Sequence, residues 1–213
     1  MSFITNPVEI ERRSFEIIAE RLALDGRQFA PQNESIIKRV IHTTADFDYA
    51  DNLVFSDGVT SIAIESLKNR ARIVTDTNMV KAGINKSAAL HLGCDLHCFI
   101  DAPEVAESAR ESGFTRSREA VDRAAETLQN PLIFAVGNAP TALIRLYELI
   151  TARVLSPALI IAAPVGFVNV VESKEMIMRL DVPYIAARGQ KGGSNVAAAI
   201  CNALLYEATG RPG

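Results

Sequence analysis

Six short runs of β-branched and aliphatic residues, each followed by a segment with helical spacing, constrain the fold of this chain more than any other feature. The runs cover residues 53–55, 71–75, 96–100, 132–136, 159–162 and 184–187. Strands that alternate with helices form parallel sheets, because crossover helices connect the strands and cover both faces. The pattern therefore predicts an α/β fold with three layers, α/β/α, around a mostly parallel central sheet of five or six strands.

The length of the chain and its even composition favour one domain. A chain of 213 residues suits a single α/β domain, and a domain of this size buries roughly 70% of its unfolded surface. No linker, repeat or low-complexity tract interrupts the sequence. We therefore expect a single domain over residues 1–213.

Two helices are predicted before the first strand. A helix should cover residues 7–23, because its start has a capping residue, Asn6, a proline at the first helical position, Pro7, and an early carboxylate, Glu9. A second helix should cover residues 33–45. The first helix should turn one apolar face to the core, made of Ile10, Phe15, Ile18 and Leu22.

Charge and composition exclude several classes of partner. The 22 basic and 25 acidic residues give a net charge of -3, so we expect no nucleic-acid partner. The longest apolar stretch is broken by Pro164 and Gly166, which leaves it too short to span a membrane. Residues 1–7 lack a signal-peptide pattern, and the three cysteines have no disulfide spacing. We expect a cytoplasmic protein with reduced thiols.

Loops rich in glycine and proline follow three of the predicted strands. They cover residues 137–141, 163–166 and 188–194, and helix N-termini behind them would favour a bound anion. The alternative is that these glycines serve tight turns that need positive φ. The loop at 188–194 has no Walker spacing, and no Gly-x-Gly-x-x-Gly follows the first strand. Nucleotide fingerprints are therefore absent.

His42 is the histidine that best fits proton transfer. Arg39 and Asp46 lie close to it in sequence, and imidazole exchanges a proton near neutral pH. The alternative is a histidine that caps or packs at the end of its helix. A carboxylate from the acidic stretch could orient the imidazole, although aspartates at helix ends and turns are just as common. The stretch comprises Asp46, Asp48, Asp51 and Asp57.

Two other groups of polar residues have weaker functional signals. His91, Cys94, His97 and Cys98 resemble metal ligands, but neighbouring side chains on a strand point to opposite faces, so we expect no metal site. Arg116 lies in a predicted loop just before a helix, where its guanidinium could bind a carboxylate instead of being solvated. Gly-x-Ser-x-Gly is missing, so a hydrolase triad has no support.

Several distinctive segments occur in order along nearly the whole chain. They are Glu-Arg-Arg-Ser-Phe (11–15), Arg-Val-Ile-His (39–42), Asp-Thr-Asn-Met-Val-Lys-Ala-Gly-Ile (76–84), Thr-Arg-Ser (115–117), Gly-Asn-Ala-Pro-Thr-Ala-Leu (137–143), Pro-Val-Gly-Phe-Val (164–168) with Glu-Ser-Lys (172–174), and Arg-Gly (188–189) with Gly-Gly-Ser (192–194). Together these segments resemble the precorrin-8X methylmutase family of cobalamin biosynthesis. In the cobalt-early branch this family is called cobalt-precorrin-8 methylmutase.

The resemblance implies an isomerase that moves a methyl group from C-11 to C-12 of a contracted tetrapyrrole. The product would be hydrogenobyrinic acid or its cobalt form, cobyrinate, and no external methyl donor would be needed. In that family the histidine that matches His42 is the proton donor and acceptor, so the resemblance implies this role for His42. The implied substrate-binding residues are Ser14, Arg39, Asn85, Lys86 and Arg116, with the match at Asn85 less secure because the family often has threonine there.

The resemblance also implies a homodimer of α/β/α subunits that binds a tetrapyrrole. We expect no cofactor and no metal held by the protein, because cobalt, where present, would be carried by the substrate. Two alternatives stay open. One is a corrinoid carrier that binds the same ring without isomerising it, and the other is a nucleotide-binding α/β enzyme without the usual fingerprints.

Overall fold

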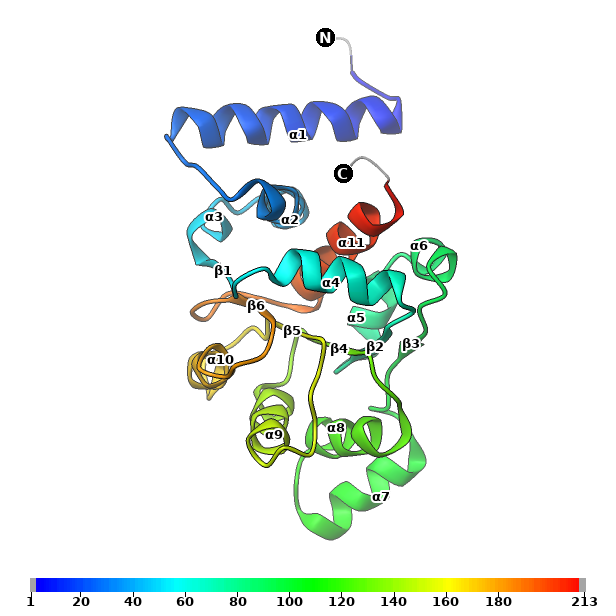
Figure 1. Ribbon diagram of the computed structural model, residues 1–213. Coiled ribbons are helices and arrows are strands. Elements are labelled where there is room, and N and C mark those ends of the chain that lie inside the picture. The colour runs from blue at the N-terminus through cyan, green and yellow to red at the C-terminus, as the bar shows by residue number, and fades with distance from the viewer. Residues whose placement is uncertain (1–2, 211–213) are drawn as a thin grey trace.

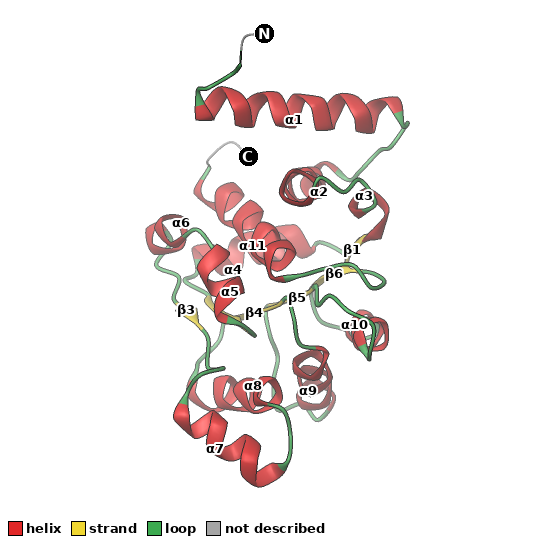
Figure 2. Cartoon of the chain, turned by 180° about the vertical axis from the view of Figure 1, so that it is seen from behind, coloured by secondary structure: helices red, strands yellow, loops and turns green. Residues whose placement is uncertain are grey.

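The computed structural model describes residues 3–210, so both ends of the predicted domain, residues 1–2 and 211–213, lie outside the described residues (Figure 1). A central sheet of six strands has the order β1-β6-β5-β4-β2-β3. Helices cover both of its faces (Figures 1 and 2). The predicted three-layer α/β/α class is confirmed. The strands are β1 (Leu53–Phe55), β2 (Arg72–Thr75), β3 (Leu96–His97), β4 (Leu132–Val136), β5 (Leu159–Ala162) and β6 (Tyr184–Ala187).

The sheet is mostly parallel, as predicted, with one antiparallel pair at one edge and a short strand at the other. Strand β1 pairs antiparallel with β6, with Leu53 opposite Ala187, whereas the other neighbours pair in parallel. The chain continues from β1 to β2, which is not its neighbour, so no crossover fixes the direction of β1. Strand β3 ends at His97 instead of residue 100, and its pairing with β2 covers only Leu96 and His97.

One helical layer surrounds the most apolar helix of the fold. Helix α11 lies against the sheet and against α2, α4 and α5, and alanine side chains allow close packing; an added Cβ on Gly83 would lie 2.8 Å from the Cβ of Ala198. Helix α1 is outermost and crosses α2 (Figure 1). The layer contains α1 (Pro7–Leu24), α2 (Pro31–Thr44), α3 (Tyr49–Asn52), α4 (Val59–Lys68), α5 (Asn78–Gly83), α6 (Lys86–His91) and α11 (Ser194–Thr209).

The other face of the sheet has its own helices and its own core. Alternate side chains of β4 separate the two cores: Ile133 packs with the α11 side, and Phe134 packs with the opposite side. Figure 2 shows this second layer clearly below the sheet. It contains α7 (Pro103–Ser112), α8 (Arg116–Thr127), α9 (Pro140–Thr151) and α10 (Val170–Met178).

The two N-terminal helices follow the sequence prediction closely. The side chain of Asn6 caps α1 by accepting hydrogen bonds from the N–H groups of Val8 and Glu9. Ile18 and Leu22 are buried as predicted, but Ile10 is 45% exposed, because it shares another face of α1 with the exposed Ile17 and Leu24. Helix α2 begins at Pro31, two residues earlier than predicted, because proline fits the first helical position.

Internal side chains hold the loops at the carboxyl ends of the strands. The carboxylate of Asp76 accepts hydrogen bonds from the N–H groups of residues 137, 138 and 139 at 2.8–2.9 Å. Burial raises the pKa of Asp76 while these three donors oppose the shift. The fully buried Lys174 donates to the carbonyls of Gly189 and Lys191, and burial lowers the pKa of Lys174 to about 8.

The glycines of the last loop serve close backbone contacts. An added Cβ on Gly192 would lie 2.3 Å from the carbonyl oxygen of Ala163, and Gly193 adopts a φ of 130°. The N–H of Gly193 donates to that same carbonyl. These contacts match the interpretation of this loop as a tight turn.

Within the described residues, none of the helices combines the length and the apolar character that crossing a bilayer would require.

Candidate active site

His42 lies where α1 crosses α2. Its imidazole stacks on the ring of Phe15 from α1, with 5.0 Å between ring centroids and an interplanar angle of 15°. Arg39 lies three residues before His42, so both side chains leave the same face of α2. The guanidinium carbon of Arg39 lies 4.6 Å from the centroid of the same Phe15 ring. One aromatic ring therefore contacts both the predicted proton donor and a predicted substrate clamp.

Arg39 is held on several sides. Its side chain is only 12% exposed, and its Nη1 lies 2.7 Å from Oε1 of Glu11. Its guanidinium also lies 5.1 Å from the ring centroid of Tyr206 in the last turns of α11. A substrate carboxylate that binds Arg39 would have to share it with Glu11 or displace it.

Asn85 joins this cluster through Tyr206. Its Nδ2 donates to the hydroxyl of Tyr206 at 3.1 Å, and its Oδ1 accepts from the N–H of Ala88 at 3.0 Å as the cap of α6. The side chain of Asn85 therefore has a structural role already. Lys86, the next residue, is exposed at the first position of α6, so its ammonium is accessible.

Ser14 lies next to Phe15 on α1 and is half-buried. Its hydroxyl donates to the carbonyl of Ile10 at 2.8 Å. The oxygen can still accept a hydrogen bond, since a hydroxyl has acceptor capacity besides its one proton.

Arg116 is not brought together with the other predicted residues. It is exposed at the first position of α8, not in a loop as the sequence suggested, because Thr115 caps this helix. The hydroxyl of Thr115 donates to that of Thr141 at 2.8 Å, which places the start of α8 beside the start of α9. Helix α8 covers the opposite face of the sheet from α2 (Figure 1). Within one chain, the sheet lies between Arg116 and His42.

Burial and charge act on the protonation of His42. Burial is the main cause that lowers the pKa of His42 below 6.5; the charge of Arg39 lowers it further, and Glu11 partly opposes both. Among residues 3–210, no hydrogen bond to the imidazole is recorded, and its ring contact is Phe15. The neutral imidazole is therefore favoured in the folded protein more than in free histidine.

The acidic stretch after α2 does not orient His42. Asp46 and Asp48 each accept from the ammonium of Lys191 at 2.6 Å, and Asp51 pairs with Arg27. Asp46 also accepts the N–H of Asp48, as aspartates in turns often do. The turn interpretation of these carboxylates fits the structure.

Two adjoining hollows lie along the α1–α2 crossing. One, of about 340 Å³, is lined by Phe15, Ser35 and Lys38. The other, of about 500 Å³, shares Lys38 and Glu34 with the first and adds Arg27. Pockets for small molecules span roughly 300–1,000 Å³. Lys38 pairs with Glu34 and Arg27 pairs with Asp51, so an anionic ligand would have to compete with these carboxylates for them. Phe15 is the residue of the His42 cluster that lines one of these hollows.

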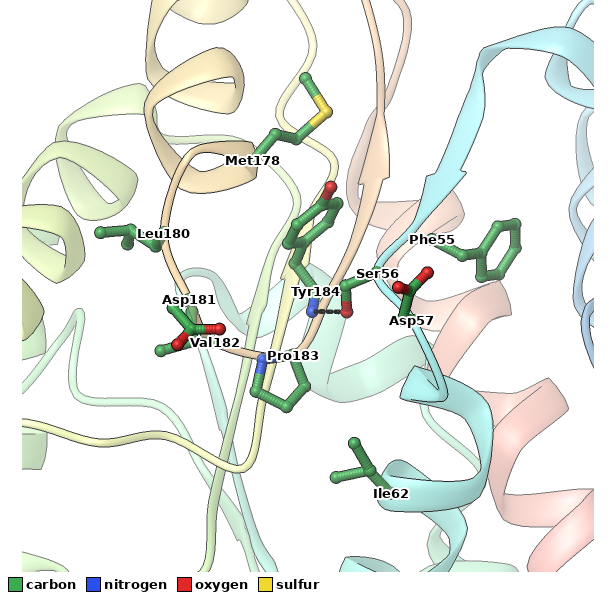
Figure 3. A pocket seen from close by; sticks show the side chains of 10 residues that line it. All are labelled: Phe55, Ser56, Asp57, Ile62, Met178, Leu180, Asp181, Val182, Pro183 and Tyr184. Carbon is green, nitrogen blue, oxygen red and sulfur yellow. Dashed lines mark hydrogen bonds between the residues drawn. The ribbon is translucent and has the colours of Figure 1, made fainter.

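A third hollow lies away from the predicted residues, between the β1–α4 loop and the α10–β6 connection (Figure 3). Its volume is about 420 Å³, and its charged lining residues are Asp57 and Asp181. Two carboxylates without a basic lining residue would repel a substrate that carries carboxylates. We therefore place the candidate site at the α1–α2 crossing.

Two of the four residues that resemble metal ligands in the sequence make other contacts in the structure. The thiol of the buried Cys94 donates to the carbonyl of Leu67, and His97 stacks on Phe99 with 5.9 Å between centroids. Residues 3–210 contain no group of three or more histidine, cysteine or acidic side chains that could hold a metal ion.

Sequence reasoning missed the connecting residues of the site. The sequence predicts Phe15 only as part of the apolar face of the first helix, Glu11 only as part of a motif, and no site role for Tyr206. The motif of residues 11–15 and the i, i+3 spacing of Arg39 and His42 were available signals. The contacts with Tyr206 depend on how the helices cross, which no local pattern specifies.

The fold and the site define a three-layer α/β protein with a half-buried histidine and a paired arginine at the crossing of two outer helices. Comparison with known proteins makes this class specific. The chain matches the model of the precorrin-8X methylmutase family over residues 9–207. A cobalt-precorrin-8 methylmutase from Salmonella typhimurium is 44% identical over 209 residues, which are 97% of this chain and 98% of that protein.

Further relatives agree with this match. A precorrin-8X methylmutase from Pseudomonas aeruginosa is 37% identical over 97% of this chain and 99% of its own. The crystal structure of precorrin-8X methylmutase from Thermus thermophilus aligns with a TM-score of 0.87 at 35% identity, covering 94% of this chain and 98% of that chain. The chain therefore belongs to the precorrin-8X methylmutase family, whose members are isomerases.

Replacing Glu11 with Gln should lower the pKa of His42 further. The change removes the one charge that raises this pKa and leaves the charge of Arg39 unopposed. Titration of the histidine Cε1–H resonances by NMR measures the effect. Glu16→Gln, on the same helix, is the matched control and should leave His42 unchanged. If the pKa of His42 is unchanged or raised in Glu11→Gln, the charge of Glu11 is not what raises the pKa of His42 in the unchanged protein.

Proposed function

We propose that this chain catalyses the methylmutase step on precorrin-8X or cobalt-precorrin-8 in corrin ring biosynthesis. In the proposed reaction the methyl group leaves C-11 and binds C-12, which gives hydrogenobyrinic acid or cobyrinate. The observation that carries the proposal is the position of His42, half-buried beside Arg39 and Phe15, in a chain of this family. The enzyme needs no cofactor in this proposal, and any cobalt arrives as part of the substrate.

His42 acts as proton donor and acceptor in the proposed mechanism. Its imidazolium gives a proton to a ring nitrogen, which draws electron density into the conjugated system. The bond from the methyl carbon to C-11 then breaks as the bond to C-12 forms, and the proton returns to the imidazole. Because burial and the charge of Arg39 lower the pKa of His42, its imidazolium releases the proton more readily than free histidine does.

Cationic side chains around His42 bind the carboxylates of the macrocycle in this proposal. Arg39 is the clamp nearest to His42, and the exposed ammonium of Lys86 can reach outward from α6. Ser14 offers its hydroxyl oxygen. Orientation of a rigid ring by several such contacts lowers the entropic part of the barrier.

A second copy of the chain completes the proposed site. Ile10, Ile17 and Leu24 recur every seven residues along α1 and are 45%, 49% and 87% exposed, which forms an apolar stripe suited to a helix of a partner subunit. Ser14 lies on this stripe. We propose a homodimer in which Arg116 of one subunit reaches the His42 site of the other, since the sheet separates the two residues within one chain.

A cytoplasmic location is also part of the proposal. It is supported by three unpaired cysteines, of which Cys94 and Cys201 are buried.

His42→Asn should lower the rate of conversion by about 10²- to 10⁴-fold, the usual contribution of a positioned acid, while binding of the substrate is retained. Conversion of precorrin-8 is followed by its visible spectrum, with His91→Asn, at the exposed end of α6, as the matched control. Full activity of His42→Asn would remove His42 from the chemistry. Binding without conversion by the unchanged protein would instead favour a corrinoid carrier.

Mixing two inactive variants tests the shared site. Arg116→Ala should impair conversion, whereas Arg110→Ala, on the neighbouring helix α7, should not. Random pairing of His42→Asn with Arg116→Ala subunits should restore about one quarter of the activity, because half of the dimers are mixed and each holds one intact site. Activity no higher than that of the parents would contradict an Arg116 supplied by the partner subunit.

A further inference from the structure

Phe15 contacts the two residues on which the proposed reaction depends. Its ring lies at stacking distance from the imidazole of His42 and within 4.6 Å of the guanidinium carbon of Arg39. No hydrogen bond within residues 3–210 is recorded for the imidazole, so no carboxylate or carbonyl of these residues fixes its plane. In many sites a hydrogen bond to one ring nitrogen has that function.

Stacking has a chemical advantage over such a hydrogen bond. Both nitrogens of an imidazole lie in the ring plane, so a partner that covers one face holds the plane and leaves both nitrogens available. The near-parallel angle of 15° corresponds to this arrangement. Because an aromatic face also tolerates a cation, the contact can persist while the imidazole gains and loses its proton.

We propose that Phe15 is a positioning residue for the methylmutase reaction: its ring fixes the plane of the His42 imidazole. Because the same ring contacts Arg39, it also fixes the position of the imidazole relative to that guanidinium. The inference rests on the proposed function of His42 and deepens it. It assigns to an apolar side chain an orienting function that a carboxylate of residues 46–57 could also have served. Phe15 itself transfers no proton and touches no reacting atom.

The surroundings of Phe15 leave room for a conservative test. The ring lines the hollow of about 340 Å³ together with Ser35 and Lys38, so Phe15→Tyr can direct its hydroxyl into open space. Phe15→Leu keeps an apolar side chain between α1 and α2 but removes the aromatic face. The charged groups whose fields act on His42 are Arg39 on its own helix and Glu11 on α1, and both variants retain them.

The test combines NMR with steady-state kinetics on the full chain. In the unchanged protein and in Phe15→Tyr, the ring current should displace the Cε1–H resonance of His42 from its free value, and Phe15→Leu should lose this displacement. Phe15→Leu should also raise the pKa of His42 toward its ordinary value, because burial lowers this pKa and loss of the ring that covers one face of the imidazole would expose it to water. The kcat of Phe15→Leu for precorrin-8 should fall about 10- to 100-fold with a smaller change in KM, whereas Phe15→Tyr should keep the kcat of the unchanged protein.

Phe47→Leu is the matched control, since Phe47 packs against Arg21 at 4.0 Å in the same way but touches no histidine. It should change stability and leave the His42 resonance and kcat unchanged. Should Phe15→Leu fail to fold, Phe15→Met fills the space with a flexible chain and carries the same expectation. A folded variant without the ring that keeps the resonance position and kcat of the unchanged protein overturns the positioning role. That result is distinct from failure of the proposed function, which would appear as full activity in His42→Asn.

Discussion

The burial of α11 between the sheet and the outer helices is the packing constraint on which the rest of the structure depends. The helix has apolar residues on nearly every side, and its small alanines let α2, α4 and α5 approach closely. A helix that is apolar all round has to be covered on all sides. Covering α11 therefore brings together segments that are far apart in the sequence, including the helices of His42 and of Asn85.

The two ends of α11 serve different parts of the molecule. Its first residue, Ser194, hydrogen-bonds Thr77 next to the loops at the carboxyl ends of the strands, where Asp76 and Lys174 hold the backbone. Its last turns carry Tyr206, which contacts Arg39 and Asn85. The candidate site therefore lies in the outer helical layer, not in the crevice beyond the strands where α/β proteins most often bind ligands.

Periodic patterns predicted most of the fold because each is local. All six strands and the helices between them follow from short β-branched runs and helical spacing. The antiparallel direction of β1 could not be predicted, because no crossover to its neighbour fixes it. His42 could be found from its chemistry and its sequence neighbours, but its partners could not. The stack with Phe15 and the contact of Arg39 with Tyr206 depend on the angles at which three helices cross, and the separation of Arg116 depends on which face of the sheet α8 covers.

The central claim is that the imidazole of His42 exchanges a proton with the bound macrocycle at the α1–α2 crossing. The most direct measurement is the crystal structure of the protein with its corrinoid product bound. The account predicts the ring at this crossing, with a nitrogen of His42 in hydrogen-bonding distance of the macrocycle and the Phe15 ring behind the imidazole. A product bound elsewhere, for example against Asp57 and Asp181 in the third hollow, with His42 remote from the ring, would contradict it.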